Sequence, residues 1–195
     1  DRLVRRGAGG RLERAGFLQN MPDWWPYSWP VLFGGRLYDP GANRAEFTDP
    51  ATVAAYEWVR GYPQRLGVGE SREFAGAYNR SFHTAQDPFM SGRVAMIAQG
   101  PWIANFIRRF APGLDYAACP LPVAESMVDP QRPVGLLEAD VLLIPLGCPH
   151  PEEAFEFVRF MQRTDVQETL AIEHCKSSPM RVVSEGFVRN HPNRF

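Results

Sequence analysis

The apolar residues of the chain fall into short runs, and the run at 93–98 is the most regular. It is preceded by Gly92 and followed by Gly100 and Pro101. A short apolar run between such residues predicts a buried strand. Proline suits the first turn of a helix, and apolar residues then recur at helical spacing: Trp102, Ile103, Phe106, Ile107 and Phe110. The pattern predicts a strand, a glycine turn and a helix with a tryptophan in its first turn.

The end of this predicted strand is a candidate ligand site. Ligands in open α/β sheets bind at the carboxyl ends of strands. A helix start offers unbonded N–H groups, and Trp102 offers a flat apolar face. Gly100 and Trp102 therefore suit a polar, disc-shaped ligand such as a sugar. The alternative is a tryptophan that only closes a core.

Three other segments show strand patterns. Weak alternation at 11–19 predicts an edge strand, and apolar runs predict further strands at 114–118 and 139–145. Helices are predicted from caps and from apolar spacing. Thr48 or Asp49 caps a helix that ends near Gly61 and Pro63, and two more helices follow residues 149–151 and 164–165.

The stretch 21–35 is rich in tryptophan and proline. Its prolines exclude a regular helix or an inner strand, so a loop or a broken helix is expected. Trp24, Trp25 and Trp29 either pack under neighbouring helices or line a cleft. Both interpretations stay open at this point.

Two acids, Glu138 and Asp140, lie at the start of the strand predicted at 139–145. Residues i and i+2 of a strand share a face, so both carboxylates are candidates to accept sugar hydroxyls. One alternative is a solvated strand end. Another is the acid–base pair of a glycoside-processing enzyme, but two acids on one side of a scissile bond suit hydrolysis poorly. Arg181 is a further candidate contact, with a surface position favoured.

Composition narrows the range of functions. The chain has 195 residues and a formal net charge of -1, which suits one large domain or two small lobes and gives no reason to expect nucleic acid or an anionic membrane as partner. The three cysteines form no CxxC pair, so three buried, unreactive thiols are expected and no metal site. No phosphate-binding glycine motif, dinucleotide fingerprint or nucleophile motif is found, so no cofactor and no enzyme activity are expected.

The order of these motifs resembles the extracellular solute-binding proteins of sugar ABC transporters, the maltose-binding-protein-like family. The resemblance covers about Gly16 to Arg181. Its most specific parts are SGRVAM…GPW at 91–102 and PEEAFEFVRFMQ at 151–162, and the others are FTDP at 47–50, CPLP at 119–122 and SSPMR at 177–181.

This resemblance implies an α/β fold, with a lobe of the type II periplasmic-binding-protein kind (a mixed sheet flanked by helices) and an incomplete two-lobe architecture. Residues 11–143 would form the C-terminal lobe, and 144–174 a helix pair returning to a missing N-terminal lobe. Residues 175–195 would return to the C-terminal lobe. Apolar residues of the helix pair would then lack part of their sheet, so self-association is expected.

By the same resemblance, the chain would be the substrate-binding component of an ABC importer. It would bind a sugar or oligosaccharide in an interlobe cleft for delivery to permease subunits, without a cofactor. The family's motif positions place Trp102 against the ligand. Of the tryptophans in the aromatic loop, Trp29 holds the position that best matches the family's pattern. The resemblance implies a periplasmic or extracellular location. It allows a membrane-anchored lipoprotein, and the signal peptide is expected to lie outside this chain. A protein-interaction domain using the Trp-rich loop is the alternative.

Overall fold

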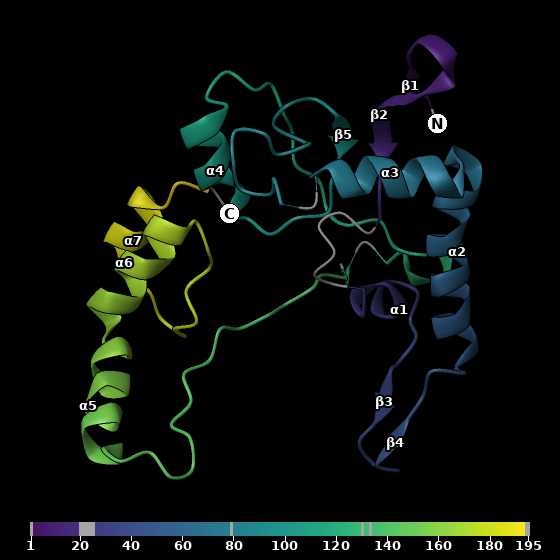
Figure 1. Ribbon diagram of the computed structural model, residues 1–195. Helices are drawn as coiled ribbons and strands as arrows, with labels where there is room; N and C mark the ends of the chain where they lie inside the picture. Colours follow the sequence, from purple (N-terminus) through teal and green to yellow (C-terminus); the bar gives the residue numbers. More distant parts are fainter. Residues whose placement is uncertain (1, 20–25, 79, 130, 133, 194–195) are drawn as a thin grey trace. The chain divides into compact units, whose positions relative to one another are not determined.

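The computed structural model describes residues 2–19, 26–78, 80–129, 131–132 and 134–193 (Figure 1). The chain divides into two compact units. Unit 1 comprises Asp1–Gln99 and Phe110–Leu136, and unit 2 comprises Gly100–Arg109 and Leu137–Phe195. The lobe ranges predicted at 11–143, 144–174 and 175–195 stay a prediction.

The sheet of unit 1 has three strands: β1 (Arg5–Arg6), β2 (Leu12–Phe17) and β5 (Val94–Met96). The central strand is β2, which pairs antiparallel with β1 and parallel with β5, with Ala15 opposite Val94. The strand predicted at 93–98 is confirmed. The strand predicted at 11–19 is confirmed too, but the prediction that it lies at the edge of the sheet is wrong, because β2 is the central strand. Its weak alternation has a physical reason, because Ala15 and its neighbour Gly16 are both buried.

The main helices of unit 1 are α1 (Ser28–Leu32), α2 (Pro50–Leu66) and α3 (Val68–Tyr78). Figure 1 shows α1 beside α2, and α3 following directly after it. The predicted cap at Asp49 is confirmed, because its carboxylate accepts the amides of Ala51 and Thr52 at 3.0 and 3.1 Å. The predicted helix end is wrong. The helix continues through Gly61 and Pro63, since its last residue, Leu66, is needed in the core.

Two apolar clusters fill unit 1. One joins the central strands to the second and third helices, and its buried members are Leu12, Ala15, Leu18, Leu66, Phe74 and Val94. The other surrounds Trp29 with Leu32 and Ala55, and Trp58 packs against it. Short elements complete the unit: η1 (Ala8–Gly10), β3 (Tyr38–Asp39) paired with β4 (Arg44–Ala45), and η2 (Glu125–Met127).

Unit 2 is mainly helical. It contains most of α4 (Ile103–Phe110) together with α5 (Pro151–Met161), α6 (Thr164–His174) and α7 (Glu185–Asn190). In Figure 1, α6 lies beside α7 and α5 leads into α6, in agreement with their contacts. The predicted helices after 149–151 and 164–165 are therefore confirmed. A small set of buried side chains holds the unit: Ile107, Ala171, Cys175 and Phe187.

Two predicted strands are wrong. Residues 114–118 and 139–145, all of them described, form no strand. The second segment is exposed: Leu143 is 82% exposed, Val141 71% and Leu142 49%. An apolar run becomes a strand only where a neighbouring strand accepts its backbone hydrogen bonds, and these two segments pair with none of the described strands.

The expectation of three buried cysteines is also wrong. All three are free thiols, but Cys119 is exposed, Cys148 is partly exposed, and Cys175 alone is buried. The described residues contain no group of three or more His, Cys, Asp or Glu side chains placed to hold a metal ion. Of the helices within those residues, none is both long and apolar enough to cross a bilayer.

Candidate functional site

Gly100 and Trp102 stand at the start of unit 2, where α4 begins. The first amides of this helix donate to carbonyl oxygens three residues earlier, at 3.1–3.2 Å: 103 to 100, 104 to 101 and 105 to 102. The expectation of unbonded N–H groups at this helix start is therefore wrong for these three amides. A tight first turn satisfies them before a ligand can.

Gly100 allows the indole its position. A Cβ atom at residue 100 would lie 2.0 Å from Cζ3 of Trp102 and 2.2 Å from Cη2. The six-membered ring therefore lies directly against the glycine backbone, and any larger residue there would push it away. Trp102 is partly exposed. The structure thus brings two of the predicted site residues into direct contact.

A lysine that the sequence reasoning missed completes this arrangement. Lys176 Nζ lies over the Trp102 ring, 5.1 Å from its centroid. The same ammonium donates to Asp140 Oδ2 at 2.5 Å. Because this hydrogen bond and the positive charge stabilise the carboxylate, the pKa of Asp140 is lowered from its ordinary value of 3.8. We call Gly100, Trp102, Asp140 and Lys176 the Trp102 cluster.

The backbone of Lys176 is held in place at the end of α6. Cys175 has a φ of 54°, the left-handed conformation that ends many helices. The Lys176 amide then donates to the Ala171 carbonyl at 2.9 Å. The His191 ring bonds the Lys176 carbonyl at 2.9 Å, and Asn193 Nδ2 donates to the Cys175 carbonyl at 2.8 Å. The lysine side chain therefore projects from a fixed turn.

A second set of contacts joins α4 to the same turn. Asn105 Nδ2 donates to the Glu173 carbonyl at 2.5 Å, and the Cys175 thiol lies 3.0 Å from Asn105 Oδ1. Arg108 donates to the Cys175 sulfur at 3.4 Å. The helix that carries Trp102 and the turn that carries Lys176 are thus fixed to each other within unit 2. One sequence signal marks Lys176: it is the single lysine of the chain, whose Lys+Arg total is 21.

The tryptophans of the aromatic stretch 21–35 are not part of the Trp102 cluster. Trp24 and Trp25 lie outside the described residues. Trp29 is 5% exposed and packs in the core of unit 1, with its ring centroid 5.1 Å from that of Trp58 and 6.2 Å from that of Phe17. Of the two interpretations left open for Trp29, the structure therefore supports packing under neighbouring elements.

Glu138 and Asp140 differ in what surrounds them. The two residues do not share a strand face as predicted, because their segment is not a strand. Both are exposed, and Asp140 accepts a hydrogen bond from Lys176. The geometry therefore places Asp140 in the Trp102 cluster and leaves Glu138 beside it on the same segment.

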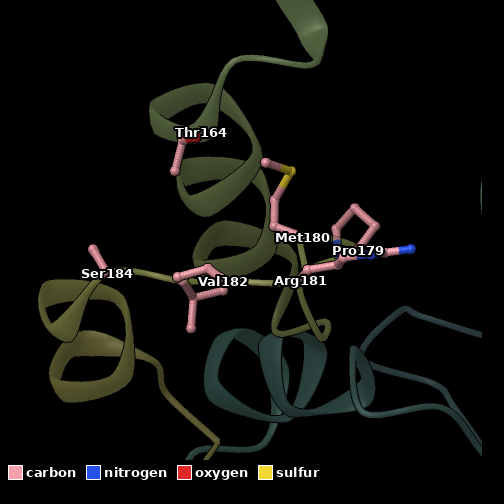
Figure 2. Close-up of a pocket in the computed structure, with 7 residues that line it drawn as sticks. Thr164, Pro179, Met180, Arg181, Val182 and Ser184 are labelled. Carbon is pink, nitrogen blue, oxygen red and sulfur yellow. The ribbon is translucent and has the colours of Figure 1, made fainter.

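Arg181 lies on the rim of a separate pocket of unit 2. This open pocket of about 700 Å³ is formed by segment 179–184 and by Thr164 at the start of α6 (Figure 2). Its lining is largely apolar, and the side chain of Arg181 is exposed. This position agrees with the favoured surface interpretation of Arg181. No contact connects this arginine with the Trp102 cluster among the described interactions.

The chain belongs to a known family. A family model described as bacterial extracellular solute-binding protein matches residues 19–181. This match spans most of the chain and contains every member of the Trp102 cluster. The resemblance stated from the sequence motifs is therefore confirmed at the level of the family, and the class of protein is a solute-binding protein.

Two solved structures share the fold. The first is described as CpMnBP1 with mannobiose bound: it has a TM-score of 0.71 at 22% sequence identity, over 91% of this chain and 44% of that chain. The second, CpMnBP1 with mannotriose bound, has a TM-score of 0.67 at the same identity and coverage. The chain thus spans less than half the length of these structures. The likeness confirms the expected mixed α/β fold of a solute-binding protein lobe.

Proposed function

We propose that this chain is part of the sugar-binding component of an ABC importer, and that Trp102 and Asp140 of the Trp102 cluster contact the sugar. The observation that carries the proposal is the partly exposed indole of Trp102 beside the carboxylate-bearing pair Asp140–Lys176, in a chain of the solute-binding family. An aromatic face with polar groups at its edge matches the two surfaces of a sugar. The ring packs on the C–H face, and the carboxylate accepts hydrogen bonds from hydroxyls.

The proposed function is binding without chemistry. Asp140 is ionised and paired with Lys176, which suits acceptance of hydroxyl hydrogen bonds and gives it no proton to donate at neutral pH. Glu138 is a second exposed acceptor on the same segment. We include Gly100, Trp102, Asp140 and Glu138 in the proposed site, keep Arg181 as a peripheral residue, and assign no role to Trp29.

A mannose-containing oligosaccharide is the first ligand class to test. CpMnBP1 was solved with mannobiose and with mannotriose bound, and the present chain shares the fold of that protein. The permease subunits of an ABC importer are the proposed partners, and the periplasm or the cell exterior is the proposed location, free or lipid-anchored. Because the chain spans 44% of the length of those structures, its own affinity is expected to be lower than that of a two-lobe protein.

The test is isothermal titration calorimetry of the chain with mannobiose, mannotriose, maltose and cellobiose. The proposal expects saturable binding of at least one sugar and no new product after long incubation. Trp102→Ala should weaken binding by about tenfold, because a stacked aromatic ring contributes roughly 0.5–1.5 kcal/mol in addition to the apolar area that it buries. Phe47→Ala is the matched control, since Phe47 is an exposed aromatic of unit 1, 62% exposed. Equal losses in both variants, or release of a cleaved sugar, would contradict the proposal.

A further inference from the structure

The position of Lys176 raises a steric question about the Trp102 face. Carbon atoms in van der Waals contact lie about 3.5–4.0 Å apart, so a stacked sugar needs the space directly above the indole. The Lys176 ammonium already lies over this ring, 5.1 Å from its centroid. A sugar ring has its own thickness and cannot fit between the two. The lysine and a stacked sugar therefore compete for one space.

The contacts that hold Lys176 over the ring are weak enough to be broken. The Lys176 side chain is 35% exposed and that of its partner Asp140 is 88% exposed. A partly exposed cation–π contact and an exposed ion pair each contribute little. The ammonium sits on a flexible stem of four carbons, whereas its backbone is fixed by the turn after α6. The head group can swing away while the turn stays in place.

The choice of lysine fits this role. The chain uses arginine at every other basic position, and Lys176 is its single lysine. An arginine would stack its planar guanidinium on the indole and bind the carboxylate with two hydrogen bonds. Such an occupant would be hard to displace. A compact, strongly hydrated ammonium leaves the ring more readily.

We propose that Lys176 is a displaceable cover of the Trp102 face. In the sugar-free chain its ammonium lies over the indole, and a bound sugar takes that place while the lysine moves aside. This inference rests on the proposed function, and it identifies Lys176 as a positioning residue that sets the affinity of the site.

The single lysine makes the movement measurable. Reductive methylation with ¹³C-formaldehyde keeps the charge of Lys176 and labels one side chain in addition to the terminal amine. In the sugar-free chain, the Lys176 methyl signal should show an indole ring-current shift that is absent from Trp102→Ala. Addition of mannobiose or mannotriose should move the signal to the Trp102→Ala position as binding saturates. A signal that keeps its ring-current shift at saturation would overturn the inference.

Affinity gives the second measurement. Removal of the competing ammonium in Lys176→Ala should tighten sugar binding by about three- to tenfold, the equivalent of the two weak contacts. Arg189→Ala is the matched control, since Arg189 is an exposed cation of α7 in the same unit. The sugar affinity of this control variant should equal that of the unmodified chain. Binding by Lys176→Ala where the unmodified chain shows none also supports the inference.

The two hypotheses fail in different ways. If the unmodified chain binds sugar and Lys176→Ala binds equally or more weakly, the cover is overturned and the proposed function stands. If neither protein binds any sugar of the panel, both are overturned.

Discussion

Two apolar runs of this chain have the same pattern in the sequence, but one is buried in the structure and the other is exposed. Val94 is 1% exposed in β5, where it pairs beside Ala15 of β2. Val141 is 71% exposed in the segment 139–145 of unit 2, and the neighbouring Leu143 is 82% exposed. The comparison teaches that an apolar run specifies a tendency to be buried, whereas a partner strand decides whether burial occurs.

The same substitution at both valines gives the largest expected difference. Val94→Asp should lower the free energy of unfolding by about 3–5 kcal/mol, because it buries a charge and removes a core side chain. Val141→Asp should change it by less than about 0.5 kcal/mol, since that side chain is in solvent. Urea denaturation followed by circular dichroism measures both. Similar losses at the two sites would mean that the second run is buried in solution.

Two aspartates extend the comparison to polar groups. Asp87 is 1% exposed and accepts the amides of Phe89, Met90 and His83 at 2.9, 3.2 and 3.3 Å. Asp87→Ala should cost about 2–3 kcal/mol, because it leaves buried donors without an acceptor. Asp140→Ala removes an ion pair whose carboxylate is 88% exposed and should cost less than about 0.5 kcal/mol. Equal destabilisation by Asp87→Ala and Asp140→Ala in the same denaturation assay would contradict the expectation that only Asp87 is important for stability.

The exposed run should also affect how the chain associates. Leu143 and Leu146 are 82% and 107% exposed, and Phe155, Phe157 and Phe160 of α5 are each at least 50% exposed. Burial of a leucine stabilises by about 1.5–3 kcal/mol, so contact between copies of the chain is favoured. Sedimentation velocity should show concentration-dependent association that weakens about tenfold in a Leu143→Ser, Leu146→Ser variant. A strictly monomeric unmodified chain at high concentration would contradict this expectation.

The smallest effect is a difference in pH dependence between the units. Burial lowers the pKa of His83 from its ordinary value of 6.5, and the Asp87 carboxylate only partly opposes this shift. Below pH 6.5 the unfolded chain therefore binds a proton that the folded chain does not, so stability falls as the pH drops from 6.5 toward the folded pKa. Thermal midpoints between pH 7.5 and 5.5 test this, with His83→Asn as the comparison because asparagine tolerates the positive φ of 60°.

Unit 2 responds in a different pH range. Because Lys176 lowers the pKa of Asp140 below 3.8, this pair stabilises the folded state above that value and is lost as the pH falls through the lowered pKa. A high salt concentration should remove most of the effect, since both groups are accessible to solvent. The difference in thermal midpoint between the unmodified chain and Asp140→Ala should therefore be constant near neutral pH and shrink only below pH 3.8, and a difference that varied with pH near neutrality would contradict the assignment.

The sequence alone determined the features that depend on near neighbours. The cap at Asp49, the strand through Val94 and the start of α5 at Pro151 all arise from residues within one or two turns of each other. The family followed from the order of such motifs along the chain, and the match over 19–181 agrees with it. Trp102 and Gly100 were predicted as site residues in the same way, because a glycine turn before an aromatic helix start is a local pattern.

The tertiary structure decided everything that needs a distant partner. It carried α2 through Pro63 because Leu66 fills the core, it buried Trp29 against Trp58, and it paired Val141 with none of the described strands. It also placed Lys176 over the ring of Trp102, two residues that no local pattern connects. Caps and turns are stabilised by contacts within a few residues, whereas burial, strand pairing and the assembly of a site depend on chain segments that only folding brings together.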